Sequence, residues 1–169
     1  VQNLITRAQY KVQNLLGRNG TSKGVSQRWA QMQSVQQTAL KQIVEPVVRA
    51  MFLADAAPLG GHVVTSSGFT DRFAQRGPRD SEGRSLRDLQ LDGQLFQYPL
   101  SYMIYTDSFN ALPPAALEYI DARIVEVLQG RDTTGISGRL DAAQRAAISQ
   151  ILVETLPRFG KTLGKSPSR

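Results

Sequence analysis

Arginine is the residue type best placed to do chemistry in this sequence, because five arginines lie within one short stretch. The stretch contains Arg72, Arg76, Arg79, Arg84 and Arg87 and no lysine. A guanidinium group favours fixed, two-pronged contacts with carboxylates and phosphates, so these residues are candidates for binding a partner or an anion. Acidic residues are interleaved with them. The second interpretation is that these charges pair with one another and with helix ends, which holds a long loop against the body of the protein.

An aromatic segment follows the arginines and is the second candidate. It consists of five Phe and Tyr residues: Phe96, Tyr98, Tyr102, Tyr105 and Phe109. The last four have helical spacing, which core packing explains if the tyrosine hydroxyls reach partners at the rim. The alternative is a pocket or interface that stacks against a ligand, a cofactor or another subunit. Nucleic acid is excluded there, because no basic residue lies between Arg87 and Arg123.

Residues suited to catalysis or metal binding are few. The chain has no cysteine and one histidine, His62, which excludes thiolate metal sites, cysteine nucleophiles, covalent haem attachment and clusters of histidines within the chain. Nucleophile-elbow, phosphate-loop, zinc-protease and dinucleotide-binding motifs are also missing. His62 is expected to be a hydrogen-bonded loop residue, or else a single axial ligand to a group held by another chain. We expect no catalytic residue, no metal site and no cofactor, with an enzyme of unrecognised type as an alternative.

Helices must position these candidates, because apolar residues recur every three or four positions along most of the chain. Residues 1–16 and about 25–57 have this pattern, and a glycine-containing turn separates them. Residues 1–57 are therefore expected to form an antiparallel helical hairpin. Pro46 lies inside the second helix and is expected to kink or split it. Glutamines on the outer face of that helix fit either a solvated surface or a helix–helix interface.

Residues 58–157 are expected to form a compact helical body with a long irregular loop. A short helix is expected over 68–75. Ser85 and Asp88 have the spacing of a capping box, which predicts that a helix starts there. Pro99 predicts the first turn of another helix, which reaches to about residue 111. The run Leu100–Tyr105 is the one stretch that could also be a strand.

The remaining helices have clearer boundaries. Pro114 predicts the start of one helix and Gly130 its end. Asp141 and Gln144 form a capping box at the start of the next, which Pro157 stops. Residues 158–169 are expected to be a mobile basic tail. The sequence thus predicts an all-α fold of about six or seven helices that fold as one unit.

The net charge of +6 is distributed unevenly. Residues 1–60 carry seven basic and two acidic groups, whereas residues 101–130 carry one and four. A basic surface suits an acidic partner or an anionic lipid surface, and the acidic stretch can face a basic one in the same or a neighbouring copy. The basic residues lack the clustering of a nucleic-acid arm. No apolar run reaches the roughly 18 residues of a membrane-spanning helix.

Three stretches of the chain are distinctive sequence motifs. They are SGFTDRF at 67–73, RGPRDSEGRSLRD at 76–88 and YPLSYMIY at 98–105. With them, residues 50–155 resemble a family of exported bacterial proteins of no known function. The resemblance implies an envelope location, in the periplasm, with the cytoplasm as the alternative. Some members occur near c-type cytochromes, and since this chain cannot attach such a haem, the resemblance implies only an accessory role beside an electron-transfer complex.

These observations favour a non-catalytic interaction or structural subunit of a bacterial envelope assembly. Its partners are expected to be other proteins or copies of itself, with peripheral membrane association compatible with the charge. The alternative is a small-molecule or redox-cofactor-associated domain that uses residues 96–109 and the arginines of 72–87.

Overall fold

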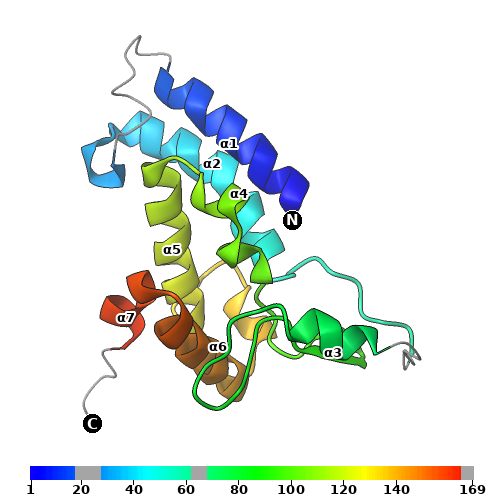
Figure 1. The fold of residues 1–169 in the computed structure, drawn as a ribbon. Coiled ribbons are helices and arrows are strands. Elements are labelled where there is room, and N and C mark those ends of the chain that lie inside the picture. Colours follow the sequence, from blue (N-terminus) through cyan, green and yellow to red (C-terminus); the bar gives the residue numbers. More distant parts are fainter. Residues whose placement is uncertain (18–27, 62–67, 165–169) are drawn as a thin grey trace. The chain divides into compact units, whose positions relative to one another are not determined.

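The computed structural model describes residues 1–17, 28–61 and 68–164 (Figure 1). These residues contain seven α-helices and three short 3-10 helices, and their only strands form one small hairpin. The predicted all-α fold is therefore confirmed. The chain divides into two compact units: unit 1 is Val1–Met51 with Met103–Ile124, and unit 2 is Phe52–Tyr102 with Val125–Arg169. His62 lies outside the described residues, so neither interpretation of it is tested.

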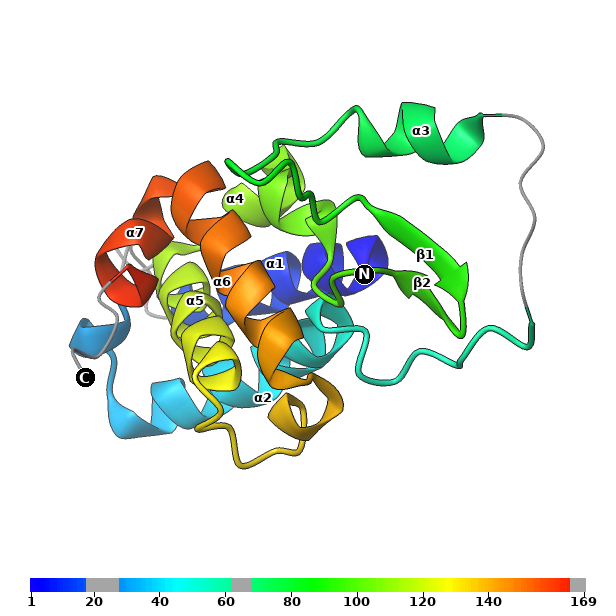
Figure 2. The same cartoon turned by 90° about the horizontal axis from the view of Figure 1, so that it is seen from below.

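Unit 1 contains the predicted hairpin, made by α1 (Gln2–Gly17) and α2 (Ser34–Met51), which lie side by side in both views (Figures 1 and 2). The short 3-10 helix η1 (Trp29–Gln31) precedes α2, so the second helix begins later than expected. α2 continues through Pro46, and the proline does not split it. Proline removes one backbone hydrogen bond there, and the buried Val44 and Val47 on either side anchor the helix.

The cores of these two helices follow the three- and four-residue spacing expected of them. α1 buries Ile5, Ala8, Val12 and Leu16. α2 buries Leu40, Val44, Val47, Val48 and Met51. Each of these side chains is at most 2% exposed, so the hairpin is held together mainly by apolar packing.

α5 (Pro114–Leu128) begins at the predicted proline, and its first part belongs to unit 1. Glu45 of α2 accepts hydrogen bonds from the Tyr119 hydroxyl and from Arg123 Nη2, both at 3.0 Å. The side chain of Arg123 is only 9% exposed, and a buried charge of this kind is tolerated when it is paired. Glu45 therefore fixes α2 against α5.

The helix predicted from Pro99 to about residue 111 is wrong as a single element. The structure has a 3-10 helix, η2 (Tyr102–Tyr105), and a separate short helix, α4 (Asp107–Asn110). Thr106 separates them, because its extended backbone and its hydroxyl, which accepts from the Phe109 N–H at 3.3 Å, form an N-cap. The run Leu100–Tyr105 is not a strand.

The helix predicted to start at Ser85 is also wrong. Ser85 and Asp88 do make a capping-type contact, because the Ser85 N–H donates to Asp88 Oδ2 at 2.8 Å, but the contact closes a turn. The chain then forms an antiparallel hairpin of β1 (Leu89–Asp92) and β2 (Gln94–Phe96). Gly93 takes a φ of 71° at the turn, a conformation that favours glycine and that a helix does not allow.

The later helices of unit 2 end and begin where their capping residues predict. After α5, the Gly130 N–H donates to the Val127 carbonyl and the Arg131 N–H to the Glu126 carbonyl, and Gly130 has a φ of 71°. These two bonds form a Schellman motif. α6 (Ala142–Thr155) begins at the predicted capping box, in which Asp141 Oδ1 accepts from the Gln144 N–H at 2.7 Å.

Unit 2 also contains two short helices. The short helix α3 (Phe69–Ala74) falls within the predicted 68–75. The mobile tail predicted from residue 158 is wrong over its first part, because α7 (Pro157–Leu163) follows α6 directly. Phe159 is 1% exposed and anchors α7. The basic composition of the segment did not predict this buried aromatic residue. None of the helices in the described part of the chain is long and apolar enough to cross a bilayer.

Candidate functional site

Unit 1 has a groove of about 460 Å³ between α1 and α2. α1 lines it with Leu4, Arg7, Ala8 and Lys11. α2 lines it with Ala39, Gln42, Ile43, Pro46 and Val47. We call it the hairpin groove. Its position over about two turns of each helix follows from the antiparallel packing of the pair.

The floor of the hairpin groove is apolar because each helix has a wider apolar stripe than its packing partner covers. Leu4 belongs to the stripe of α1, but Ile5 is the residue that is fully buried, and Leu4 is left half-buried. On α2, Ala39 and Ile43 are likewise half-buried and Pro46 is exposed. Apolar side chains with remaining solvent contact are favourable points for a partner to cover.

The rim of the hairpin groove is cationic. Arg7 and Lys11 are both exposed and lie four residues apart, so they share one side of α1. Among the residues that the structure describes, no acidic side chain lines the groove, and α1 contains none. Within the described residues neither cation forms an ion pair. Two like charges at this spacing repel each other weakly, so an anionic group bound between them is favoured.

The arginines predicted from the sequence lie in unit 2, and Arg84 is paired with a buried carboxylate. The side chain of Asp80 is fully buried. Its carboxylate accepts a hydrogen bond from Arg84 Nε at 2.8 Å and forms an ion pair with Arg84 Nη2 at 2.7 Å. Asp80 also accepts the backbone N–H groups of Glu82 and Arg84. Burial acts to raise the pKa of the Asp80 carboxyl group, but the hydrogen bonds and charge of Arg84 outweigh burial and lower the pKa.

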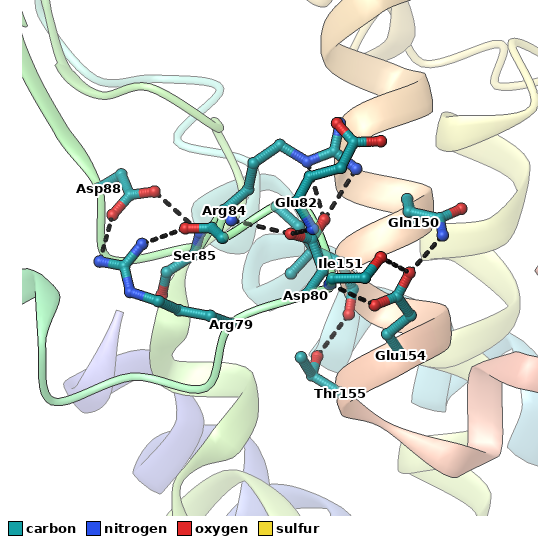
Figure 3. Close-up of polar contacts among 12 residues, drawn as sticks. Arg79, Asp80, Glu82, Arg84, Ser85, Asp88, Gln150, Ile151, Glu154 and Thr155 are labelled. Carbon is teal, nitrogen blue, oxygen red and sulfur yellow. Dashed lines mark hydrogen bonds and ion pairs between the residues drawn. The ribbon is translucent and has the colours of Figure 1, made fainter.

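Arg79 is held within the same loop. It pairs with Asp88 at 3.0 Å and also donates to the backbone carbonyl of Gly83. Figure 3 shows this loop facing α6, where Glu154 and Gln150 lie. The Ser81 backbone N–H and hydroxyl donate to Glu154 at 2.5 and 2.9 Å, and these bonds together with one from Gln150 lower the pKa of the Glu154 carboxyl group. The loop is therefore fastened to α6.

The guanidinium group of Arg87 makes cation–π contacts with two aromatic rings. Its guanidinium carbon lies 4.2 Å from the ring centre of Phe73 and 4.1 Å from that of Tyr102, and its Nε donates to the Phe73 carbonyl at 3.0 Å. Gly77 lies so close that an added Cβ would approach Arg87 Cδ to 2.7 Å. The side chain is thus clamped between α3 and the segment around Tyr102.

The structure separates the five predicted arginines by role. Arg79, Arg84 and Arg87 contact groups of the protein itself, as the pairing interpretation describes. Arg72 lies exposed on α3 and Arg76 exposed just after it. The anion-site interpretation of the five arginines therefore stays a prediction.

The predicted aromatic segment is also divided. Phe96 and Tyr102 lie in unit 2, with ring centres 6.1 Å apart, and both contact Phe73. Tyr98 is buried in the same unit, and burial raises the pKa of its hydroxyl although Arg84 acts in the opposite direction. Tyr105 and Phe109 belong to unit 1, where Phe109 is fully buried. The helical spacing of these residues therefore does not produce one stripe.

No group of three or more His, Cys, Asp and Glu side chains able to hold a metal occurs among residues 1–17, 28–61 and 68–164. The hairpin groove was not among the sequence candidates. Its one signal was an acid-free, amphipathic α1 with cations four residues apart.

No protein-family model, curated protein or solved structure matches this chain.

Proposed function

We propose that this protein is a non-catalytic interaction subunit whose hairpin groove binds an acidic, amphipathic helix of a protein partner. The observation that carries the proposal is an apolar groove with a cationic rim, whose described lining residues include no acid. A helix that lies in a groove contacts it through apolar residues at positions i, i+3, i+4 and i+7. Carboxylates beside those positions would meet Arg7 and Lys11.

A different protein fits the groove better than a second copy of this chain. The basic residues of unit 1 could be matched by the acidic stretch 101–130 of a neighbour, but Glu118 of that stretch accepts the Trp29 N–H at 2.8 Å and pairs with Arg28. Glu45, the acid of α2, is bound by Arg123. These two carboxylates are used within the protein, and Asp107 is the one exposed acid of the stretch 101–130, so a partner with several exposed carboxylates matches the groove better than a second copy.

The setting of the interaction is inferred from the resemblance given above. We place the assembly in the bacterial envelope, on its periplasmic side, as an accessory to an electron-transfer complex. Cell fractionation with an antibody to the chain tests this part separately. Recovery in the cytoplasm would remove the envelope location and leave the groove proposal intact.

Charge reversal tests the groove directly. The chain carrying Arg7→Glu and Lys11→Glu is used as bait in a native pull-down from the producing cells, followed by mass spectrometry. Both side chains are exposed, so the fold is expected to persist, and circular dichroism checks this. We expect the wild-type chain to retain a defined partner with an acidic helix, and the double variant to lose at least nine-tenths of it.

A matched control separates the groove from overall charge. Arg131→Glu and Lys161→Glu change the net charge equally but alter exposed residues of unit 2. This control is expected to retain the partner. Equal loss from both double variants would show that charge alone is responsible, and a lone monomer from the wild type would contradict the proposal. Recovery of the chain with only copies of itself would replace it with self-association.

A further inference from the structure

A second hollow lies within unit 2 and is independent of the hairpin groove. It has a volume of about 380 Å³ and is lined by three segments of the chain: residues 52–59 after α2, residues 93–99 around β2, and residues 139–140 before α6. The Leu59 N–H donates to the Gly93 carbonyl at 3.0 Å, which joins two of these walls. The volume falls within the range of small-molecule sites, and this backbone bond holds two of the walls together.

The lining of this hollow is almost entirely apolar. Apart from Gly93, Gln94 and Arg139, every lining residue is aliphatic, aromatic or proline. Leu95 is 46% exposed, and exposed residues 56–58 continue the same apolar wall. A ligand that covers these groups removes apolar surface from water, which favours an apolar body.

The polar groups that line the hollow favour a ligand with a negatively charged group. The amide nitrogen of Gln94 already donates to Gln90 at 2.8 Å. Arg139 is exposed, is the only charged lining residue, and forms no ion pair within the described part of the chain. By contrast, Arg145 nearby in sequence is satisfied by the Ser137 and Leu140 carbonyls. A guanidinium without a partner at an apolar site suits a carboxylate.

One lining residue of the hollow has an unusual backbone conformation. Leu53 lines it with a φ of 53°, a left-handed conformation that residues other than glycine avoid. Such conformations persist where the surroundings enforce them, and they concentrate at ligand sites. Here the conformation turns the chain after α2 so that residues 56–59 can form a wall.

We propose that this hollow binds a small apolar monocarboxylate, with the hydrocarbon body against residues 52–59 and Leu95 and the carboxylate at Arg139. The ligand class combines a chain or ring of modest size with one negative charge. Among the residues of the aromatic segment, only Phe96 takes part, and the arginines of 72–87 do not.

Isothermal titration calorimetry with octanoate, octan-1-ol and acetate tests this site. Octanoate is expected to bind saturably, octan-1-ol about tenfold more weakly because it lacks the charge, and acetate not at all. Arg139→Gln is expected to lower the affinity for octanoate about tenfold and to leave the affinity for octan-1-ol unchanged. Leu95→Ser is expected to weaken both.

Arg131→Gln serves as the matched control, since Arg131 is an exposed arginine outside the hollow. It is expected to bind octanoate like the wild type. The proposal is overturned if octanoate does not bind saturably, if Arg139→Gln binds it as tightly as the wild type, or if Arg131→Gln weakens it equally. None of these outcomes depends on the hairpin groove, so the two proposals stand or fall separately.

Discussion

Asp80 organises its loop at the scale of single residues. One buried carboxylate accepts two backbone N–H groups and the side chain of Arg84, so it satisfies donors that the loop would otherwise leave unpaired. Buried donors that lose their acceptor retain the full cost of leaving water. The same loop presents Glu82 to solvent, where its pairing with Arg84 is a surface contact.

Asp80→Ala is expected to lower the free energy of unfolding by about 2 kcal/mol, because it leaves these donors without an acceptor. Glu82→Gln removes a pair from a side chain that is 66% exposed and is expected to cost less than about 1 kcal/mol. Urea unfolding of the two variants at neutral pH measures the difference. Equal losses would mean that the buried carboxylate does not organise the loop.

Asp80 is also expected to make the stability of the protein depend on pH in the acid range. The pKa of Asp80 is lower in the folded protein than its ordinary value of 3.8. Its contribution to stability is therefore complete above 3.8 and is lost as the pH falls through the lower folded-state pKa. The stability of Asp80→Ala is expected to depend less on pH in this acid range than that of the wild type. An unchanged dependence would contradict the assignment.

Residue types alone predicted which side chains could do chemistry but not which would be left available for it. Arginines interleaved with acids fit both a binding site and internal pairing, and the choice depends on distances that the sequence does not contain. For the hairpin groove the deciding detail is a one-residue difference between Leu4 and Ile5. Both fit the apolar stripe, and tertiary packing determines that Ile5 is the one fully buried.

At the scale of elements, capping chemistry was the most reliable guide. Pro114, Gly130 and the Asp141 capping box act where expected, because each satisfies backbone groups that a helix end leaves free. The stretch 85–105 was predicted poorly, since a capping-type contact at Ser85 closes a turn. A signal for the hairpin was present in Asp92-Gly93, a dipeptide typical of tight turns between strands, with apolar and polar residues alternating before it.

The cap of α6 can be tested with a matched pair. Asp141→Ala is expected to destabilise the protein by about 1 kcal/mol, because the Gln144 N–H loses its acceptor. Asp141→Asn keeps an acceptor of similar reach and is expected to stay close to the wild type. Thermal unfolding of the three proteins measures this. An equal loss from the asparagine variant would indicate that charge is responsible and that the cap is not.

For the whole molecule, the chain is organised as two units, each with its own hollow of different chemistry. The expected division into residues 1–57 and 58–157 differs from this, because residues 103–124 join the hairpin in unit 1. Sequence patterns describe neighbours along the chain, whereas these residues join α2 through long-range contacts such as those of Glu45. A cationic groove in unit 1 and an apolar hollow with one arginine in unit 2 support binding as the task of the protein.

The central claim is that a partner occupies the hairpin groove, and site-specific photo-crosslinking in the producing cells tests it most directly. A photoreactive residue replaces Gln42, which lines the groove, or Gln13, an exposed residue two positions after Lys11 and so on the other side of α1. We predict one crosslinked species of defined mass from position 42 that is lost with Arg7→Glu and Lys11→Glu, and none from position 13. Equal crosslinking from both positions, or none from position 42, would contradict the account.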